Sequence, residues 1–473
     1  MRKVPLSELF LFEAVGIDEE TRRKLLSFNR SYQTRLLRYF AELRIRFEEA
    51  SPGVVFPGLF AEVDAITGEL LPPERRRVWS WGDCRALGIW SYLLAKGVVP
   101  EEDVTIRGRH INLRRFYEDY CDLIFQKLLA RYERNGGRFP FIVDIQSNMP
   151  SDDPRNVPCA TDEREPGHIF AASGFLQYGL WRRDDRAIAL GRGFLRESLE
   201  CGLANRNVDH LTRKRALVHW GQGFLMVTAG AAVDALKCLL VVGREAVKSY
   251  DDIREELTGS ARTIAGFILS RHCDPVTGEF WEFATEDGKP FVDAAGQVVC
   301  DPGHAAEGCG FFAELCDFLP SDATDTKWPR RRILETLVKI LRFVDRHGYS
   351  SAGVMCKRFD VKTKQLIRDA VDAQGKSYVT APWWNVRECA AAAIKLYQLT
   401  GGPDCLDIYR RARNAAYLNY PNTDIGGAMV KTLDAETLLP LPFDPATGNL
   451  DPMHCPRARE RESEALASLD LQG

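Results

Sequence analysis

The sequence lacks several features that mark specialised classes of protein. Its 63 Lys and Arg residues nearly balance its 66 Asp and Glu residues, so the net charge of -3 offers no general attraction to nucleic acid or to an anionic membrane. No apolar run reads as long enough to span a bilayer, and the N-terminus becomes acidic before any signal-type apolar segment develops. We therefore expect a cytoplasmic protein that binds neither nucleic acid nor membrane.

Paired cysteines and glycine-rich loops are also missing. The 13 cysteines are scattered without the short paired spacings of a zinc site, and several lie inside apolar helical runs. We interpret them as reduced, mostly buried thiols, and we expect no metal site. The sequence contains no glycine-rich nucleotide loop, so a nucleotide effector is unsupported, and we expect no cofactor.

What the chain does contain is a weak internal repeat. Each unit opens with a glycine, continues with about six residues that are usually apolar or aromatic, and in most cases reaches an acidic residue. The third unit is the weakest, and helical patterns fill the spaces between units. The leading glycines are Gly58, Gly137, Gly202, Gly278, Gly353 and Gly427, separated by 79, 65, 76, 75 and 74 residues.

Each unit therefore holds two helices and one short extended turn. Six such hairpins can close into a ring, in which every hairpin buries both flanks. We predict a twelve-helix toroid that spans residues 1–473 as one domain. An N-terminal helical extension is expected at about 1–35, a long loop at about 145–166, and a charged helical tail after Arg457. An open solenoid is the alternative.

The most informative stretch runs from Asp301 to Glu307, in the fourth unit. Asp301 is a good N-cap and Pro302 suits the first helical position, which places His304 in the first turn of a helix. The helix dipole favours a neutral imidazole there. Glu307 shares the same face, and a nearby carboxylate can fix the ring's orientation and tautomer. This setting suits a general base, and the alternative is a structural histidine.

Polar residues recur at one position of the repeat. His304, His454 and Arg85 lie 26, 27 and 27 residues after the leading glycines of their units, so a closed ring would bring them to one mouth. Trp384 and Glu388 come from the unit between the two histidines. Aromatic faces stack on sugar rings, histidines abstract protons beside a carbonyl, and arginine stabilises the oxyanion that forms.

Four motifs give the sequence a resemblance to the N-acylglucosamine 2-epimerase family. This family includes cellobiose 2-epimerases and aldose–ketose isomerases that act on mannose-type sugars. The resemblance implies an all-α (α/α)6 barrel, in agreement with the repeat, with short β-hairpin turns at the active-site end. The motifs are Trp81-Gly82-Asp83-Cys84-Arg85, Pro302-Gly303-His304-Ala305-Ala306-Glu307, Trp383-Trp384 followed by Glu388, and His454-Cys455-Pro456-Arg457.

The resemblance also implies a function and a set of site residues. The expected enzyme is a cofactor-independent sugar 2-epimerase or aldose–ketose isomerase, which removes the C2 proton of a small sugar to form a cis-enediolate. His304 and His454 would be the acid/base pair, and a homodimer is possible. The residues expected to hold the sugar are Arg85, His219, Glu307, Trp384, Glu388 and Arg457.

One departure and two alternatives accompany this hypothesis. The family often has a lysine shortly before the paired tryptophans, where this sequence has Thr380-Ala381-Pro382. The same barrel can host a glycoside hydrolase or lyase, which would use Glu307 and Glu388. It can also host a binding protein without catalysis. The remaining histidines carry weaker signals: His168 is undecided between site and core, and His110, His210, His272 and His347 read as surface or loop residues.

Overall fold

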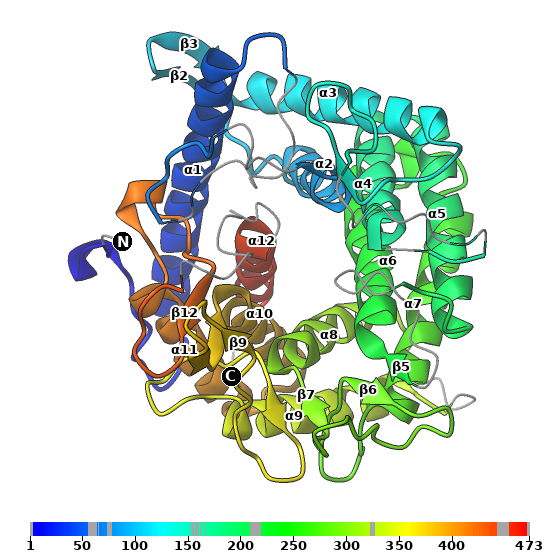
Figure 1. Ribbon diagram of the computed structural model, residues 1–473, viewed down its shortest axis with the longest axis vertical. Helices are drawn as coiled ribbons and strands as arrows, with labels where there is room; N and C mark the ends of the chain where they lie inside the picture. Colours follow the sequence, from blue (N-terminus) through cyan, green and yellow to red (C-terminus); the bar gives the residue numbers. More distant parts are fainter. Residues whose placement is uncertain are drawn as a thin grey trace.

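A computed structural model describes residues 3–54, 64, 66–72, 78–152, 156, 160, 162–164, 166–208, 219–321, 327–441 and 454–470. Within these ranges twelve α-helices form two concentric rings (Figure 1). The inner ring consists of α2 (Ser80–Ala95), α4 (Pro166–Arg182), α6 (Gln222–Val242), α8 (Pro302–Leu315), α10 (Trp383–Thr400) and α12 (His454–Ala467). The outer ring consists of α1 (Glu19–Ala50), α3 (Leu113–Arg134), α5 (Asp185–Leu203), α7 (Tyr250–Arg271), α9 (Arg330–His347) and α11 (Pro403–Asn419).

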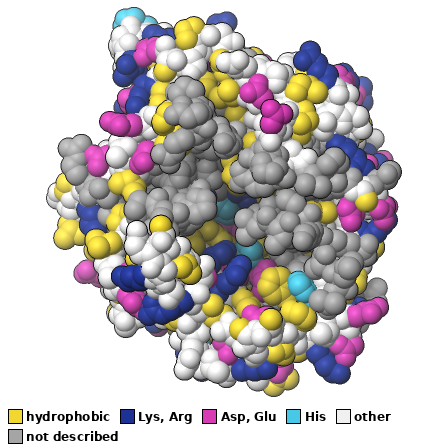
Figure 2. Space-filling model, in the orientation of Figure 1, with side chains coloured by type: hydrophobic (Ala, Val, Ile, Leu, Met, Phe, Trp, Pro, Cys, Tyr) yellow, Lys and Arg dark blue, Asp and Glu magenta, His cyan; other side chains and the backbone are white. Residues whose placement is uncertain are grey.

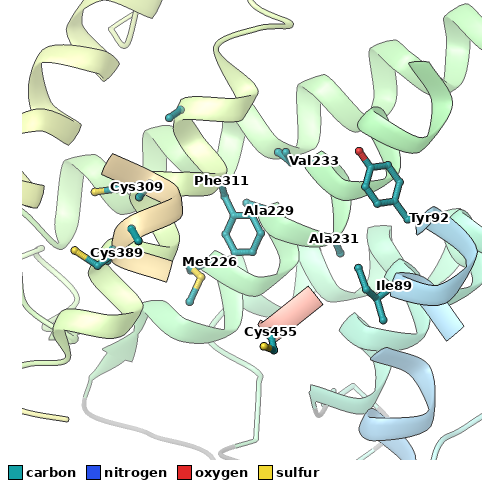
Figure 3. Packing of buried hydrophobic residues seen from close by; sticks show 14 of the residues in the cluster. Ile89, Tyr92, Met226, Ala229, Ala231, Val233, Cys309, Phe311, Cys389 and Cys455 are labelled. Atoms are coloured by element: carbon teal, nitrogen blue, oxygen red, sulfur yellow. The ribbon is translucent and has the colours of Figure 1, made fainter. Parts of the chain in front are cut away.

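The two rings differ in sequence because they differ in surroundings. An outer helix such as α9 buries one stripe, including Ile333, Leu337 and Ile340, and turns charged residues to solvent. Inner helices have neighbours on both sides; α6 and α8 are apolar nearly all round, whereas α12 is highly charged. Small residues let them approach closely: a Cβ on Gly230 of α6 would lie 2.2 Å from the ring of Phe311 of α8. Figure 3 shows that ring packed among side chains of α6.

One expectation about apolar runs is wrong. Helix α6 has 21 residues and contains an 18-residue window with a mean hydropathy of 2.0, so by length and composition it is able to cross a membrane. However, 67% of that apolar window is buried inside the protein, and α6 packs against α4, α7 and α8. Its composition is therefore that of a core helix of the barrel.

The ring is closed, which excludes the open solenoid. Helix α12 packs against α10 on one side and α1 on the other. Lys96, directly after α2, pairs with Glu460 of α12 at 2.5 Å and also with Glu464, which in turn accepts a hydrogen bond from Tyr92. The all-α barrel predicted from the sequence is thereby confirmed.

Short two-stranded sheets gather the N-terminal ends of the inner helices at one end of the barrel. In four of these pairs, a strand that leads into an inner helix joins the strand that follows an outer helix. They are β1 (Val78–Trp79) with β4 (Ile142–Val143), β5 (Trp220–Gly221) with β6 (Phe283–Ala284), β7 (Val299–Cys300) with β8 (Phe359–Asp360), and β11 (Thr380–Pro382) with β12 (Thr432–Asp434). Two further hairpins are β2 (Asp103–Ile106) with β3 (Arg109–Asn112), and β9 (Ala370–Val371) with β10 (Ser377–Tyr378).

The repeat behind this architecture holds in most units. Gly137, Gly278, Gly353 and Gly427 follow outer helices and adopt a positive φ of 79° to 86°, which favours glycine. Gly202 is different, because it lies inside α5 and leads no turn. Gly58 lies outside the described residues.

The two ends of the sequence differ from expectation. The segment at 1–35 is no separate extension, because α1 continues to Ala50 as one of the twelve helices. The segment after Arg457 is charged and helical, as predicted, but it forms part of the barrel and not a tail. It belongs to the inner helix α12, where Arg459, Glu460, Arg461 and Glu462 are buried. Figure 1 shows α12 inside the outer ring.

Two smaller expectations concern a loop and the cysteines. Of the predicted loop at 145–166, the structure describes 145–152, 156, 160 and 162–164, and Pro166 begins α4. The twelve described cysteines are all buried and none forms a disulfide, as expected of reduced core thiols.

Candidate active site

The N-terminus of α8 is built as the sequence predicts. Asp301 caps the helix, and its Oδ1 accepts hydrogen bonds from the backbone N–H groups of Gly303 (3.0 Å) and His304 (3.2 Å). Pro302 occupies the first position. Gly303 allows α8 to approach α10, since a Cβ there would lie 2.3 Å from Oδ1 of Asn385. His304 is thereby fixed in the first turn, beside the start of α10.

His304 is anchored by carboxylates, but not by the one expected. Its Nδ1 lies 3.1 Å from Oε1 of Glu282 and 3.6 Å from Oδ2 of Asp301, whereas Glu307 pairs elsewhere. Lys357 also binds Asp301, at 2.5 Å. Burial lowers the pKa of His304, but Asp301 and Glu282 outweigh burial and hold that pKa above its ordinary value. The neutral form that the helix dipole favours is therefore not the one its surroundings stabilise.

The second predicted histidine has its own carboxylate. His454 is the first residue of α12, and its Nδ1 lies 2.8 Å from Oε1 of Glu388 on α10. Arg457 binds Glu388 at 2.9 Å and also binds Glu307 of α8, so one guanidinium joins three inner helices. Burial raises the pKa of Glu388, but Arg457, the hydrogen bond from His454 and Arg461 outweigh it and hold that pKa well below its usual range. Glu388 is therefore an ionised hydrogen-bond acceptor.

Trp384 brings the two histidines together. Its ring centroid lies 5.4 Å from that of His304, at an interplanar angle of 38°, and 5.4 Å from that of His454, at 24°. Its neighbour Trp383 is only 2% exposed and contacts His454 edge-on, so the tryptophan pair divides between site and core. The two imidazoles thus meet at one indole, not on opposite rims of the barrel.

Cationic groups complete this cluster. Nζ of Lys357 lies 4.5 Å from the centre of the Trp384 ring. This lysine comes from the turn after α9, far from the place where the family often has one. Figure 2 shows the face at this end hollowed near its centre, with basic, acidic, histidine and hydrophobic side chains within the hollow. Such a mixture of charge and aromatic surface suits a polyhydroxylated ligand.

Three of these residues also form a possible set of metal ligands. The ligand atoms of Glu307, Glu388 and His454 all lie within 4.8 Å of one another. Arg457 binds both carboxylates, and its Nη2 lies 3.4 Å from Nδ1 of His454. The Arg457 guanidinium therefore supplies the positive charge that a metal ion would otherwise provide to these three side chains.

Arg85 lies on the neighbouring inner helix. Its guanidinium stacks on two aromatic rings, with its carbon 4.0 and 4.7 Å from their centroids. Seven residues further along α2, Tyr92 binds Glu464, which itself follows Arg457 by seven residues on α12. Because both helices begin at the same end of the barrel, Arg85 and Arg457 lie at about the same height.

His219 lies in a different environment. Its ring contacts Phe283 at 4.8 Å and Phe291 at 4.6 Å between centroids. It directly precedes β5, whose partner strand β6 follows Glu282. The structure thus places His219 in an aromatic cluster beside the strand pair, and its described ring contacts are with phenylalanines.

Two other histidines belong to the core. His168 is buried among phenylalanines, and burial lowers its pKa to about 3. His272 was expected at the surface, and this is wrong: it is fully buried, and burial lowers its pKa to about 4. His110 is exposed, His347 is half-buried, and His210 lies outside the described residues.

Sequence reasoning missed two charged residues of the site. Glu282 lies in the extended turn led by Gly278. Nothing in the sequence of that turn indicates that its side chain contacts His304. Lys357 is far from Trp384 in the sequence, and the two side chains come into contact only in the folded protein. Gln222, which binds Glu282, opens α6 and resembles any polar residue at a helix start.

Fold and site together define a class. A closed double ring of helices is the architecture of an (α/α)6 barrel, and this one carries two carboxylate-anchored imidazoles at the N-terminal ends of its inner helices. Residues 251–443 match the protein family described as N-acylglucosamine 2-epimerase (GlcNAc 2-epimerase). This match confirms the family resemblance, and with it the prediction of an enzyme of the epimerase and isomerase class.

Solved structures share the fold across nearly the whole chain. The cellobiose 2-epimerase of Bacillus thermoamylovorans B4167 is 12% identical, with a TM-score of 0.63 over 93% of this chain and 99% of that one. The cellobiose 2-epimerase of Spirochaeta thermophila DSM 6192 is 16% identical, with a TM-score of 0.59 over 95% and 98%. A D-mannose isomerase is 14% identical, with a TM-score of 0.59 over 91% and 96%. Comparison with curated proteins gave no match.

Proposed function

We propose that the protein is a cofactor-independent sugar 2-epimerase or aldose–ketose isomerase that uses His304 and His454 as its acid/base pair. The observation that carries this proposal is the contact of both imidazoles with Trp384. The family match and the structural neighbours, cellobiose 2-epimerases and a D-mannose isomerase, support the reaction class. The cytoplasmic location and the homodimer stay predictions.

The anchoring of the rings supports a choice of reacting atoms. Each histidine meets a carboxylate through Nδ1, and a donated Nδ1–H fixes the tautomer in which Nε2 exchanges protons with the substrate. His304 is the acid of the resting enzyme, because its carboxylate neighbours favour the imidazolium. His454 then acts as the base that takes the C2 proton of the opened sugar.

Loss of the C2 proton gives a cis-enediolate, whose developing negative charge the arginines stabilise. Arg457 and Arg85 lie at about the same height in the barrel, and each guanidinium keeps its charge at every working pH. Return of a proton to C2 from the opposite face, by His304, inverts that carbon. Delivery to C1 gives the ketose instead. Trp384 offers the sugar an aromatic face beside both imidazoles.

The experiment is a sugar panel in deuterated water read by proton NMR. It contains N-acetylglucosamine, mannose, glucose, cellobiose and sulfoquinovose, and an active sugar should lose its C2 proton signal as deuterium enters. His304→Asn and His454→Asn should each abolish turnover. His110→Asn, an exposed histidine of β3 bonded to Thr105, serves as the control and should keep full activity. Full activity in either site variant would refute the acid/base assignment.

The hydrolase alternative is not favoured by the site. Glu307 and Glu388 share one guanidinium, and the pKa of Glu388 lies well below its usual range. A glycosidase needs one protonated carboxyl as its general acid. We therefore expect no release of reducing sugar from mannan or cello-oligosaccharides.

A binding protein without catalysis is the other alternative. It predicts histidines that face away from a shared site, whereas both imidazoles contact Trp384 and both are held by carboxylates. Deuterium incorporation at C2 of any bound sugar separates the two cases, because binding alone exchanges no carbon-bound proton.

A further inference from the structure

Glu282 and Gln222 form a buried pair outside all the motifs that predicted the site. Oε1 of Glu282 lies 3.1 Å from Nδ1 of His304, and its Oε2 accepts a hydrogen bond from Nε2 of Gln222 at 2.9 Å. Glu282 is 8% exposed and Gln222 is fully buried. A buried carboxylate costs free energy unless it is well bonded, so this pair needs a role.

The backbone fixes this carboxylate in place. The N–H of Glu282 donates to the carbonyl of Val299 at 2.8 Å, which ties it to the strand before α8. Its carbonyl accepts from the N–H of Gln222 at 3.1 Å, which ties it to the first residue of α6. Glu282 therefore reaches His304 from a rigid support.

We propose that Glu282 is the positioning residue of His304, and that Gln222 holds Glu282 in the orientation this requires. This inference rests on the proposed acid/base function of His304. The carboxylate takes the Nδ1–H of the imidazole, fixes the plane of the ring and directs Nε2 to the substrate. Gln222 adds a neutral hydrogen bond, so the carboxylate keeps its full charge for the imidazole.

Three charged groups face His304, and they do not act alike. Asp301 lies 3.6 Å from Nδ1, but the ammonium of Lys357 already binds its Oδ2. Glu282 is closer and has no cationic partner among the described residues other than the imidazole itself. The pKa of His304 is raised by Asp301 and Glu282 and lowered by burial and by Lys357. Removal of the Glu282 charge should therefore leave a less basic, less ordered ring.

The test reads the imidazole directly, so it needs no substrate. Protein labelled with ¹⁵N-histidine is titrated by NMR, and the His304 signals are assigned by their loss in His304→Asn. In Glu282→Gln we expect the pKa of His304 to fall by about one unit or more, and the preference for the Nδ1–H tautomer to weaken. Gln222→Met keeps the shape of the side chain without its donor, and should weaken the tautomer preference in the same way. Glu279→Gln, in the same turn but paired at the surface with Lys364, should change neither.

Activity supplies the second readout once a sugar is found. Glu282→Gln should lower kcat at least tenfold with KM little changed, because the bound sugar keeps its contacts. If no sugar reacts, the proposed function fails while the titration still decides the role of Glu282. An unchanged pKa and tautomer of His304 in both folded variants would overturn the inference. A melting temperature and a circular dichroism spectrum identify a variant that does not fold, and the other variant then decides.

Discussion

Arg387 of α10 and Glu462 of α12 form an ion pair with 2.7 Å between Nη2 and Oε2, and both side chains are completely buried. Oε1 of Glu462 also accepts hydrogen bonds from Tyr409 at 2.7 Å and from Nε of Arg413 at 3.0 Å. One carboxylate thus joins two inner helices to outer helix α11. Glu462 of the charged helix α12 is therefore paired with buried arginines inside the barrel and is not hydrated at its surface.

Loss of this carboxylate should be strongly destabilising. Glu462→Gln leaves Arg387 and Arg413 buried without a counter-charge, and we expect the free energy of unfolding to fall by about 3–5 kcal/mol. Urea denaturation at neutral pH measures the change. Glu335→Gln removes the exposed i,i+4 partner of Arg331 and is the matched control, with an expected change of at most about 0.5 kcal/mol.

The same residue predicts a dependence of stability on pH. Burial raises the pKa of Glu462, but Arg387 and Arg413 outweigh it and lower the pKa from 4.5 to about 2. The stabilisation is therefore complete above pH 4.5 and is lost as the pH falls from 4.5 towards 2. Wild type should lose more stability than Glu462→Gln across this window. Parallel slopes of unfolding free energy against pH in the two proteins would contradict the assignment.

Arg457 should be needed for both structure and activity. Arg457→Met leaves Glu307 and Glu388 facing each other without their shared cation. The pKa of Glu388 should then rise, its hydrogen bond with His454 should weaken, and turnover should fall by at least a hundredfold. Isotope exchange at C2 measures the loss. Arg410→Met, which removes a surface arginine paired with Asp407, should keep full exchange.

Gly303 should not tolerate a methyl group. Gly303→Ala forces a Cβ to within 2.3 Å of Oδ1 of Asn385 and 2.7 Å of the Trp384 ring. These two side chains or the start of α8 must therefore shift, which disturbs the contact of His304 with Trp384. We expect a destabilisation of about 1–3 kcal/mol together with a fall in kcat. Gly193→Ala in α5, where a Cβ meets nothing within 4 Å, should instead stabilise the protein by about 0.5–1 kcal/mol. Thermal melts and a C2 exchange assay compare the two.

Removal of the Lys357 charge should shift the pH profile of kcat/KM in the opposite direction to removal of the Glu282 charge. As an acid, His304 must be protonated, so activity should fall as the pH rises through a pKa above 6.5. Lys357 lowers that pKa, so Lys357→Met should shift the alkaline limb of kcat/KM to higher pH. Glu282→Gln should shift the limb to lower pH. Shifts in the same direction in both variants would exclude this electrostatic account.

The fold was predictable because its signals are local. The turn after an outer helix requires a residue with positive φ, which favours glycine. Gly278, Gly353 and Gly427 therefore mark the turns of three units directly in the sequence. The first turn of α8 was equally legible, since Asp301 caps its own helix. Each of these features depends on residues only a few positions apart.

The partners of the site were not predictable, because they come from distant parts of the chain. Glu307 was assigned to His304 by helical spacing, yet it pairs with Arg457 across the ring. Glu282 replaces it from the preceding turn. The charged residues of α12 led us to predict a tail. Nothing near them in the sequence indicates that Glu462 forms buried ion pairs with Arg387 and Arg413 inside the barrel.

Helix α12 comes last in sequence among the described helices, yet it supplies both the closing wall of the ring and His454. During synthesis, the other eleven described helices can therefore emerge and pair before His454 is in place. The proposed mechanism predicts that a ring without docked α12 is inert towards sugars whatever its helix content, because docking of α12 both closes the wall and brings His454 to Trp384. Recovery of turnover during refolding would thus time the docking of this single helix, independently of how early the others form.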